Sequence, residues 1–156
     1  MTSYFDSSAL VAIYVTESFS KKARRAARAA AQLPYTSLHD LEVRNALHVL
    51  HGRGMLDARE LRDLLGQLDE DLETHRLVEM RLDLFDVFRR AGELSRTHAA
   101  KLLCRSLDIL HVAAALVLRC TCLVSGDDRQ LSLAKAVGLD PIDVKGSRRT
   151  TRRHTR

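Results

Sequence analysis

Short apolar segments that can form β-strands alternate with longer helix-forming segments along this chain. The strand candidates are the segment that ends near Asp6 and residues 34–37, 76–82, 120–126 and 139–144. The helix candidates are residues 8–15, 18–33, 37–51, 56–74, 84–101, 106–119 and 127–138. Each parallel strand pair needs a helix-sized connection, so this order predicts a parallel sheet covered by helices on both faces. We expect an α/β fold, a three-layer α/β/α sandwich on a short central sheet.

The charge of the chain is concentrated at one end. The formal net charge is +5, and the last twelve residues hold six of the 25 basic residues and no acid. Without these six, 19 basic residues face 20 acidic ones. We therefore divide the chain into one domain, residues 1–144, and a basic tail, residues 145–156, which we expect to be disordered. The tail either contacts phosphates non-specifically or only adds solubility.

The composition excludes several classes of protein. No segment approaches the roughly 20 apolar residues of a membrane span, and residues 1–20 lack the features of a signal peptide. We expect a soluble cytoplasmic protein. Cys104, Cys120 and Cys122 do not have the usual spacing of a zinc or redox motif, so we interpret them as reduced thiols.

Four acidic residues lie inside or at the edge of apolar segments, where a carboxylate is costly: Asp6, Glu42, Asp108 and Asp127. Asp6 and Asp127 each follow a predicted strand, at the edge where parallel sheets bind ligands. Each of these two could instead cap the next helix, and Asp127 with Gln130 matches a capping box. If all four came together, their repulsion would require a cation, which indicates a metal site.

Glu42 and Asp108 have no comparable alternative as helix caps. Glu42 lies a full turn inside a helix that we expect Ser37 to cap, on a stripe that should face the core. Asp40, in capping-box position, faces away and can pair with Arg44.

Asp108 lies in the first turn of a nearly apolar helix that Ser106 could cap. His111, three residues further on, could partner Asp108, although a lone histidine on an apolar face is more often structural.

Four stretches of the sequence, taken in order, resemble the PIN-domain ribonucleases, and specifically the VapC-type toxins of type II toxin-antitoxin pairs. These stretches are YFDSSALVAIY, LEVRNALH, RSLDILHVAAAL and LVSGDDRQL, which together span residues 4–131. The resemblance implies an α/β/α sandwich and an acidic pocket that binds Mg²⁺ or Mn²⁺ and cuts single-stranded regions of RNA. It also implies a homodimer and a small antitoxin whose C-terminal segment lies in the groove.

The resemblance also assigns roles to individual residues. It implies that the metal-binding and catalytic carboxylates are Asp6, Glu42, Asp108 and Asp127, supported by Ser8, Asn45 and Ser125. Asp127 is chosen over its neighbour Asp128 because it lies two residues after Ser125, while Asp128 takes a position that is often basic in relatives. Independently of the family, hard oxygen ligands suit Mg²⁺ or Mn²⁺. Whether one or two ions bind stays open.

Basic residues on the second predicted helix are our candidates for binding the RNA backbone: Lys21, Lys22, Arg25 and Arg28. A solvated helix face is the simpler interpretation of the same pattern. The function that we predict is a Mg²⁺-dependent endoribonuclease acting as a toxin. Two alternatives stay open: another metal-dependent nuclease or phosphatase, and a catalytically idle PIN-like module that binds nucleic acid or protein.

Overall fold

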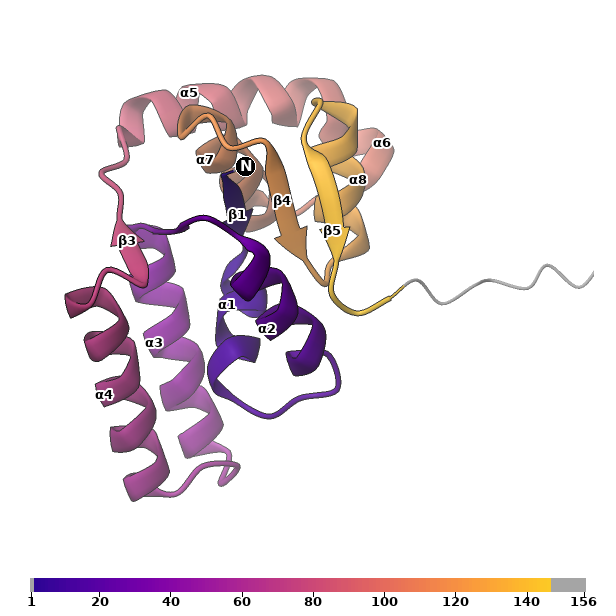
Figure 1. Cartoon of the computed structure of the whole chain (residues 1–156). Helices are drawn as coiled ribbons and strands as arrows, with labels where there is room; N and C mark the ends of the chain where they lie inside the picture. Colours follow the sequence, from indigo (N-terminus) through magenta and orange to yellow (C-terminus); the bar gives the residue numbers. More distant parts are fainter. Residues whose placement is uncertain (1, 147–156) are drawn as a thin grey trace, which may run out of the picture.

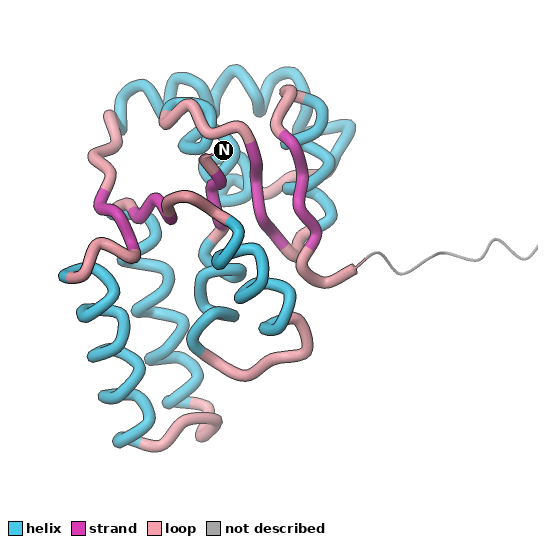
Figure 2. Tube along the Cα trace, in the orientation of Figure 1, coloured by secondary structure: helices cyan, strands magenta, loops and turns pink. Residues whose placement is uncertain are grey.

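Five short parallel strands lie at the centre of the computed structural model, which describes residues 2–146 (Figures 1 and 2). The strands are β1 (Ser3–Phe5), β2 (Leu33–Tyr35), β3 (Leu77–Glu79), β4 (Cys122–Ser125) and β5 (Asp140–Asp143). β1, β4 and β5 form one sheet in the order β1-β4-β5, and β2 pairs with β3. β2 also lies against β1. The predicted parallel sheet is confirmed, although its hydrogen bonds divide it into two pieces.

Helices connect every pair of consecutive strands. They are α1 (Ser7–Tyr14), α2 (Ser20–Ala29), α3 (Ser37–Gly52), α4 (Ala58–Glu73), α5 (Leu84–Leu94), α6 (Ala100–Leu102), α7 (Ser106–Val117) and α8 (Asp128–Ala136). A π-helical turn, η1 (Ser95–Ala99), joins α5 to α6, so the helix predicted over residues 84–101 is interrupted. The helix predicted over residues 18–33 ends earlier, because Leu33 already belongs to the buried strand β2.

The sheet separates two hydrophobic cores. Side chains of a strand alternate between its faces, and β1 and β4 use this alternation in the same way. Phe5 and Val124 pack with α1, α2, α3 and α4, whereas Tyr4 and Leu123 pack with α5, α7 and α8. Helices therefore cover both faces of the sheet, which confirms the α/β/α sandwich.

The strand register brings the ends of β1 and β4 together. Phe5 pairs with Val124 in the parallel ladder, and the backbone N–H of Asp6 donates to the Val124 carbonyl at 3.0 Å. The residues that follow these two strands, Asp6 and Ser125–Asp127, consequently share one edge of the sheet. This is the edge at which parallel sheets present ligand-binding residues.

Two predicted helix caps are wrong by one residue. Thr36, rather than Ser37, caps α3, and its capping-box partner is His39 rather than Asp40. Arg105, rather than Ser106, stands at the N-cap of α7. Asp40 instead accepts from Arg44 at 2.7 Å, as its spacing predicted.

The predicted basic tail falls almost entirely outside residues 2–146, so its prediction is not tested. Within those residues, none of the helices is both long and apolar enough to cross a membrane.

Candidate metal centre

Asp6 is the most deeply buried of the four acids, with 2 % of its surface exposed. It is the N-cap of α1, where its Oδ1 accepts from the Ala9 N–H at 2.7 Å and from the Ser8 hydroxyl at 2.9 Å. Its Oδ2 accepts from the Ser125 hydroxyl at 2.5 Å. Burial raises the pKa of Asp6 above its ordinary value, although these hydrogen bonds act in the opposite direction.

Ser125 connects Asp6 to Asp127. Its buried hydroxyl donates to Asp6 and accepts from the Asp127 N–H at 2.9 Å. Asp127 caps α8, because its Oδ1 accepts from the N–H groups of Arg129 and Gln130 at 2.8 and 3.2 Å. A cap of this kind also places a negative charge at the positive end of the helix dipole.

Gln130 extends the same chain of contacts to Asp108. Its side-chain Nε2 donates to Asp108 Oδ1 at 3.3 Å, so the capping-box role expected for Gln130 is replaced by a link between two acids. Asp108 Oδ2 accepts from the Arg105 N–H at 2.9 Å. The expectation that Asp108 has no capping role was therefore wrong: the carboxylate satisfies an N–H group at the start of α7.

Glu42 is held by a histidine and a hydroxyl. Its Oε2 lies 2.7 Å from His111 Nε2 and accepts from the Ser7 hydroxyl at 2.6 Å. The Tyr4 hydroxyl lies 2.9 Å from the other ring nitrogen of His111, so a ring with its proton on Nε2 accepts from Tyr4 and donates to Glu42. His111 thus partners Glu42, and not Asp108 as considered from the sequence.

The position of Glu42 differs from the one expected. The stripe of α3 that enters the core carries His39, Val43 and Leu47, whereas Glu42 lies at its edge with its side chain 22 % exposed. Burial raises the pKa of Glu42, but the hydrogen bonds from His111 and Ser7 outweigh it, and the net pKa is lowered. Glu42 is therefore held in its ionised form at a position that solvent can reach.

The four acids do not form a closed cluster: hydrogen bonds connect Asp6, Asp127 and Asp108, whereas Glu42 is tied to Ser7 and His111. Within residues 2–146, no group of three or more His, Cys, Asp or Glu side chains lies close enough together to hold a metal ion. Glu42 Oε1 and Asp127 Oδ2, however, accept no hydrogen bond from any of these residues. Carboxylate oxygens are the donors that Mg²⁺ and Mn²⁺ prefer, so the chemical type of these donors suits such an ion.

The three supporting residues have different surroundings. Ser8 and Ser125 both donate to Asp6, as described above. Asn45 is exposed on α3, and no hydrogen bond within the described residues ties its side chain to an acid. Its supporting role stays a prediction.

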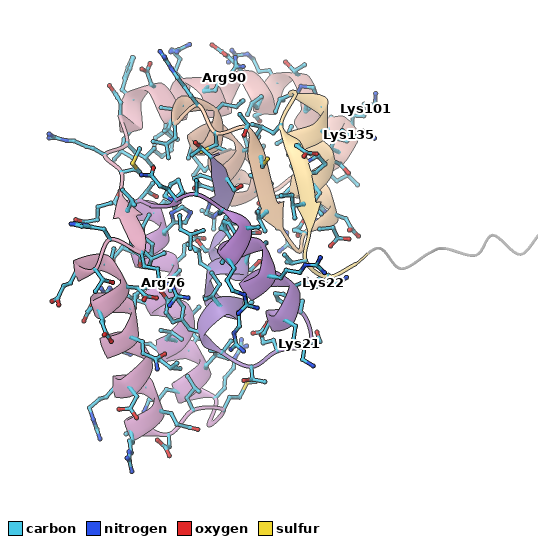
Figure 3. The ribbon with its side chains drawn as sticks, viewed as in Figure 1. Lys21, Lys22, Arg76, Arg90, Lys101 and Lys135 are labelled. Atoms are coloured by element: carbon cyan, nitrogen blue, oxygen red, sulfur yellow. The ribbon has the colours of Figure 1, made fainter. Side chains whose placement is uncertain are left out.

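The four basic candidates on α2 are exposed to solvent: Lys21, Lys22, Arg25 and Arg28. They point outward because α2 turns Ala23, Ala26 and Ala27 toward the core that it shares with α1. Figure 3 shows Lys22 beside the end of β5 and Lys21 further from it, at the start of α2. No acidic partner forms a salt bridge with any of the four within residues 2–146.

The comparison with protein families identifies the family of the fold. The model of the PIN domain matches residues 3–136 of the chain. The chain belongs to the PIN-domain family. PIN domains are in general metal-dependent nucleases, and the donor set described above agrees with that chemistry. Among curated proteins, no match to the chain was found.

A solved structure supports the same fold. FitAcB from Neisseria gonorrhoeae superposes with a TM-score of 0.65 at 10 % sequence identity, over 92 % of this chain and 98 % of that chain. At this identity the similarity concerns the fold alone.

Sequence reasoning missed Tyr4 and His39 as parts of this region. His39 is fully buried, stacks on His111 with ring centroids 5.6 Å apart, and has its Nε2 2.9 Å from the Phe5 carbonyl. The available signal was its position three residues after Thr36, since a side chain there can reach back to the N-cap N–H. Tyr4 gave no such signal, because its partner is 107 residues away.

Proposed function

We propose that this PIN domain is a Mg²⁺- or Mn²⁺-dependent endoribonuclease that acts as the toxin of a toxin-antitoxin pair. The observation that carries the proposal is the set of four carboxylates near the carboxyl edge of β1 and β4. Asp6, Asp127 and Asp108 are linked through Ser125 and Gln130, and Glu42 accepts from Ser7, the residue next to Asp6. Asp6 caps α1, but Ser, Thr or Asn would cap the helix without the cost of a buried charge, so a carboxylate at that edge favours catalysis over binding alone.

The roles of the residues follow from their contacts. A divalent cation held by Asp6, Glu42, Asp108 and Asp127 would supply activation of water and neutralisation of charge at the scissile phosphate. Ser8 and Ser125 fix the two oxygens of Asp6, and His111 and Ser7 fix one oxygen of Glu42. Such fixed orientation of the acids reduces the reorganisation that the reaction would otherwise require.

Two features support the proposed protein partners. A pocket of about 330 Å³ opens beside Glu42 and is lined by Ser8, Val11, Val49 and Leu50 among others. An antitoxin segment with apolar side chains and one cation would suit these walls. The proposed homodimer is supported by three exposed apolar side chains on α5, Leu84, Phe85 and Phe88, which are 52 %, 78 % and 61 % exposed.

The test uses the purified chain, free of antitoxin, with an RNA that has single-stranded loops and with a single-stranded DNA of matched sequence. We expect cleavage of the RNA with Mg²⁺ or Mn²⁺ and none with a chelator. Asp108→Asn should reduce the rate by on the order of 100-fold. Mg²⁺ should also raise the melting temperature, because it binds the folded state alone.

Asp57→Asn is the matched control. Asp57 caps α4 by accepting from two backbone N–H groups at 2.8 and 2.7 Å, so it is also a helix-start carboxylate, but it lies on another helix and in none of the contacts of the acid series. Intact RNA under every condition, from folded protein whose melting temperature does not respond to Mg²⁺, would refute the proposal. Cleavage of DNA alone would favour another type of nuclease.

A further inference from the structure

Lys145 packs against the loop that carries Asp127. A Cβ atom built on Gly126 would lie 3.0 Å from both Cγ and Cε of Lys145, so the side chain of Lys145 lies tightly against the loop at Gly126. Its Nζ lies 5.5 Å from the centre of the Phe19 ring, within the range of a cation–π contact. The ammonium group is therefore held between the β4–α8 loop and the start of α2.

The backbone around Lys145 is tied to the end of β4. The Val144 N–H donates to the Ser125 carbonyl at 3.1 Å. Asp143 Oδ1 then accepts from the N–H groups of Lys145 and Gly146 at 2.8 and 2.9 Å. These bonds fix Lys145 relative to Ser125, the residue whose hydroxyl binds Asp6.

Lys22 reaches the same place from α2. Gly146 has a φ of +81°, and a Cβ atom built on it would lie 2.5 Å from Lys22 Nζ, so the ammonium group rests on the Gly146 backbone. Figure 3 shows Lys22 between α2 and the end of β5, whereas Lys101 and Lys135 lie toward the other end of β5. Lys22 and Lys145, here called the lysine pair, thus both lie at the segment that follows β5. This segment is beside the sheet edge that carries Asp6 and Asp127, here called the acid edge.

The lysine pair has no anionic partner within residues 2–146, since none of the salt bridges there includes either ammonium group. Like charges on neighbouring side chains repel each other, and a bound anion would reduce that repulsion. The nearby carboxylates repel the phosphates of a nucleic acid, so binding at this edge requires cations beside them.

We propose that Lys22 and Lys145 bind a backbone phosphate of the RNA next to the acid edge and so set where the strand enters the site. This inference rests on the proposed ribonuclease function. It also assigns a specific role to Lys145, which the sequence places at the start of the basic tail.

The experiment measures binding of a fluorescent single-stranded RNA to the full-length chain, in a chelator that prevents metal-dependent cleavage, over a series of salt concentrations. Lys22→Ala and Lys145→Ala should each weaken binding about three- to tenfold at low salt and lower the slope of log K against log salt by about 0.7. Lys145→Arg should retain binding, because the charge remains. With Mg²⁺, KM for cleavage should rise in both alanine variants while kcat is kept.

Lys101→Ala and Lys135→Ala are the controls, since each removes one exposed lysine near the other end of β5. They should change binding by less than about twofold. If wild-type protein cleaves RNA but the variants of the lysine pair match these controls, the inference is wrong and the proposed function stands. If wild-type protein neither binds nor cleaves RNA, both fail.

Discussion

The carboxylates of Asp6 and Glu42 differ in how deeply they are buried and in the direction in which their pKa values are shifted. Asp6 is enclosed and receives three hydrogen bonds, yet burial still raises its pKa, so its ionised form is less favourable than in water and a cation would stabilise it. Glu42 is partly exposed, and its hydrogen bonds lower its pKa. A bound cation would therefore stabilise the ionised form of Asp6, whereas Glu42 is ionised without a cation.

His39 provides a prediction about pH at the same scale. Its Nδ1 accepts from the Thr36 N–H at 3.1 Å, so the neutral ring donates from Nε2 to the Phe5 carbonyl. Burial is the main cause that lowers the pKa of His39 from 6.5 to about 3. Below pH 6.5 His39 binds a proton in the unfolded chain but not in the folded chain. The free energy of unfolding therefore falls as the pH decreases from 6.5 toward 3.

The expected loss from this single group is about 2 kcal/mol between pH 7 and pH 5. Urea unfolding at several pH values measures it as the difference between wild type and His39→Gln, which cannot titrate. His48→Gln, an exposed histidine of the same helix, is the control and should follow wild type. An NMR titration in which the ring of His39 protonates near pH 6.5 would contradict the prediction, whether or not the variant folds.

At the scale of the element, the start of α8 gives Asp127 and Asp128 different surroundings. Asp127 precedes the helix and turns its Oδ1 to the N–H groups of the first turn, whereas Asp128 is exposed. Asn is as good an N-cap as Asp, so Asp127→Asn should keep stability within about 0.5 kcal/mol while removing the charge that a metal requires. We expect loss of cleavage in Asp127→Asn and a change below about twofold in Asp128→Asn.

RNA cleavage and urea unfolding of the two variants, measured in parallel, test this assignment. Asp127→Ala completes the series, because it removes both the charge and the cap and should cost about 1 kcal/mol in addition. Full activity in Asp127→Asn together with an inactive Asp128→Asn would assign the fourth ligand to Asp128 instead.

The elements themselves were largely predictable, because periodicity and strand–helix alternation are local properties. The sequence predicted the buried strand around Val124 and the long helix that carries Glu42. It misplaced the N-caps of α3 and α7 by one residue, since Thr36 and Ser37, or Arg105 and Ser106, offer adjacent choices that only tertiary packing decides.

The contacts of the acids could not be predicted, because they join distant parts of the chain. Ser125 is 119 residues from Asp6, and His111 is 69 residues from Glu42. A single sequence gives the residue types but not the pairing, and so His111 was assigned to the wrong acid. For the same reason the sequence did not predict where the side chain of Lys145 lies, because its position depends on contacts with Gly126 and Phe19.

At the scale of the whole molecule, the two cores place the acid edge at the boundary between two sets of helices. Asp6 and Glu42 belong to α1 and α3 on one face of the sheet, while Asp108 and Asp127 belong to α7 and α8 on the other. A cation bound by acids from both sets would join the two layers. This explains why Mg²⁺ should stabilise the entire fold and not a single helix.

The exposed apolar face of α5 leads to a prediction about assembly. Phe85 and Phe88 lie three residues apart and thus on one side of the helix, where isolated chains rarely leave two phenylalanines in water. We expect wild-type protein to elute with twice the mass of the 17.5 kDa chain in light scattering, and Phe85→Glu/Phe88→Glu to elute as a monomer.

Leu41→Glu/Met55→Glu changes two similarly exposed apolar residues elsewhere and should stay dimeric. Because all four side chains are mostly in solvent, neither variant should change helix content by circular dichroism. A dimer that survives both glutamates on α5 would place the interface on another surface.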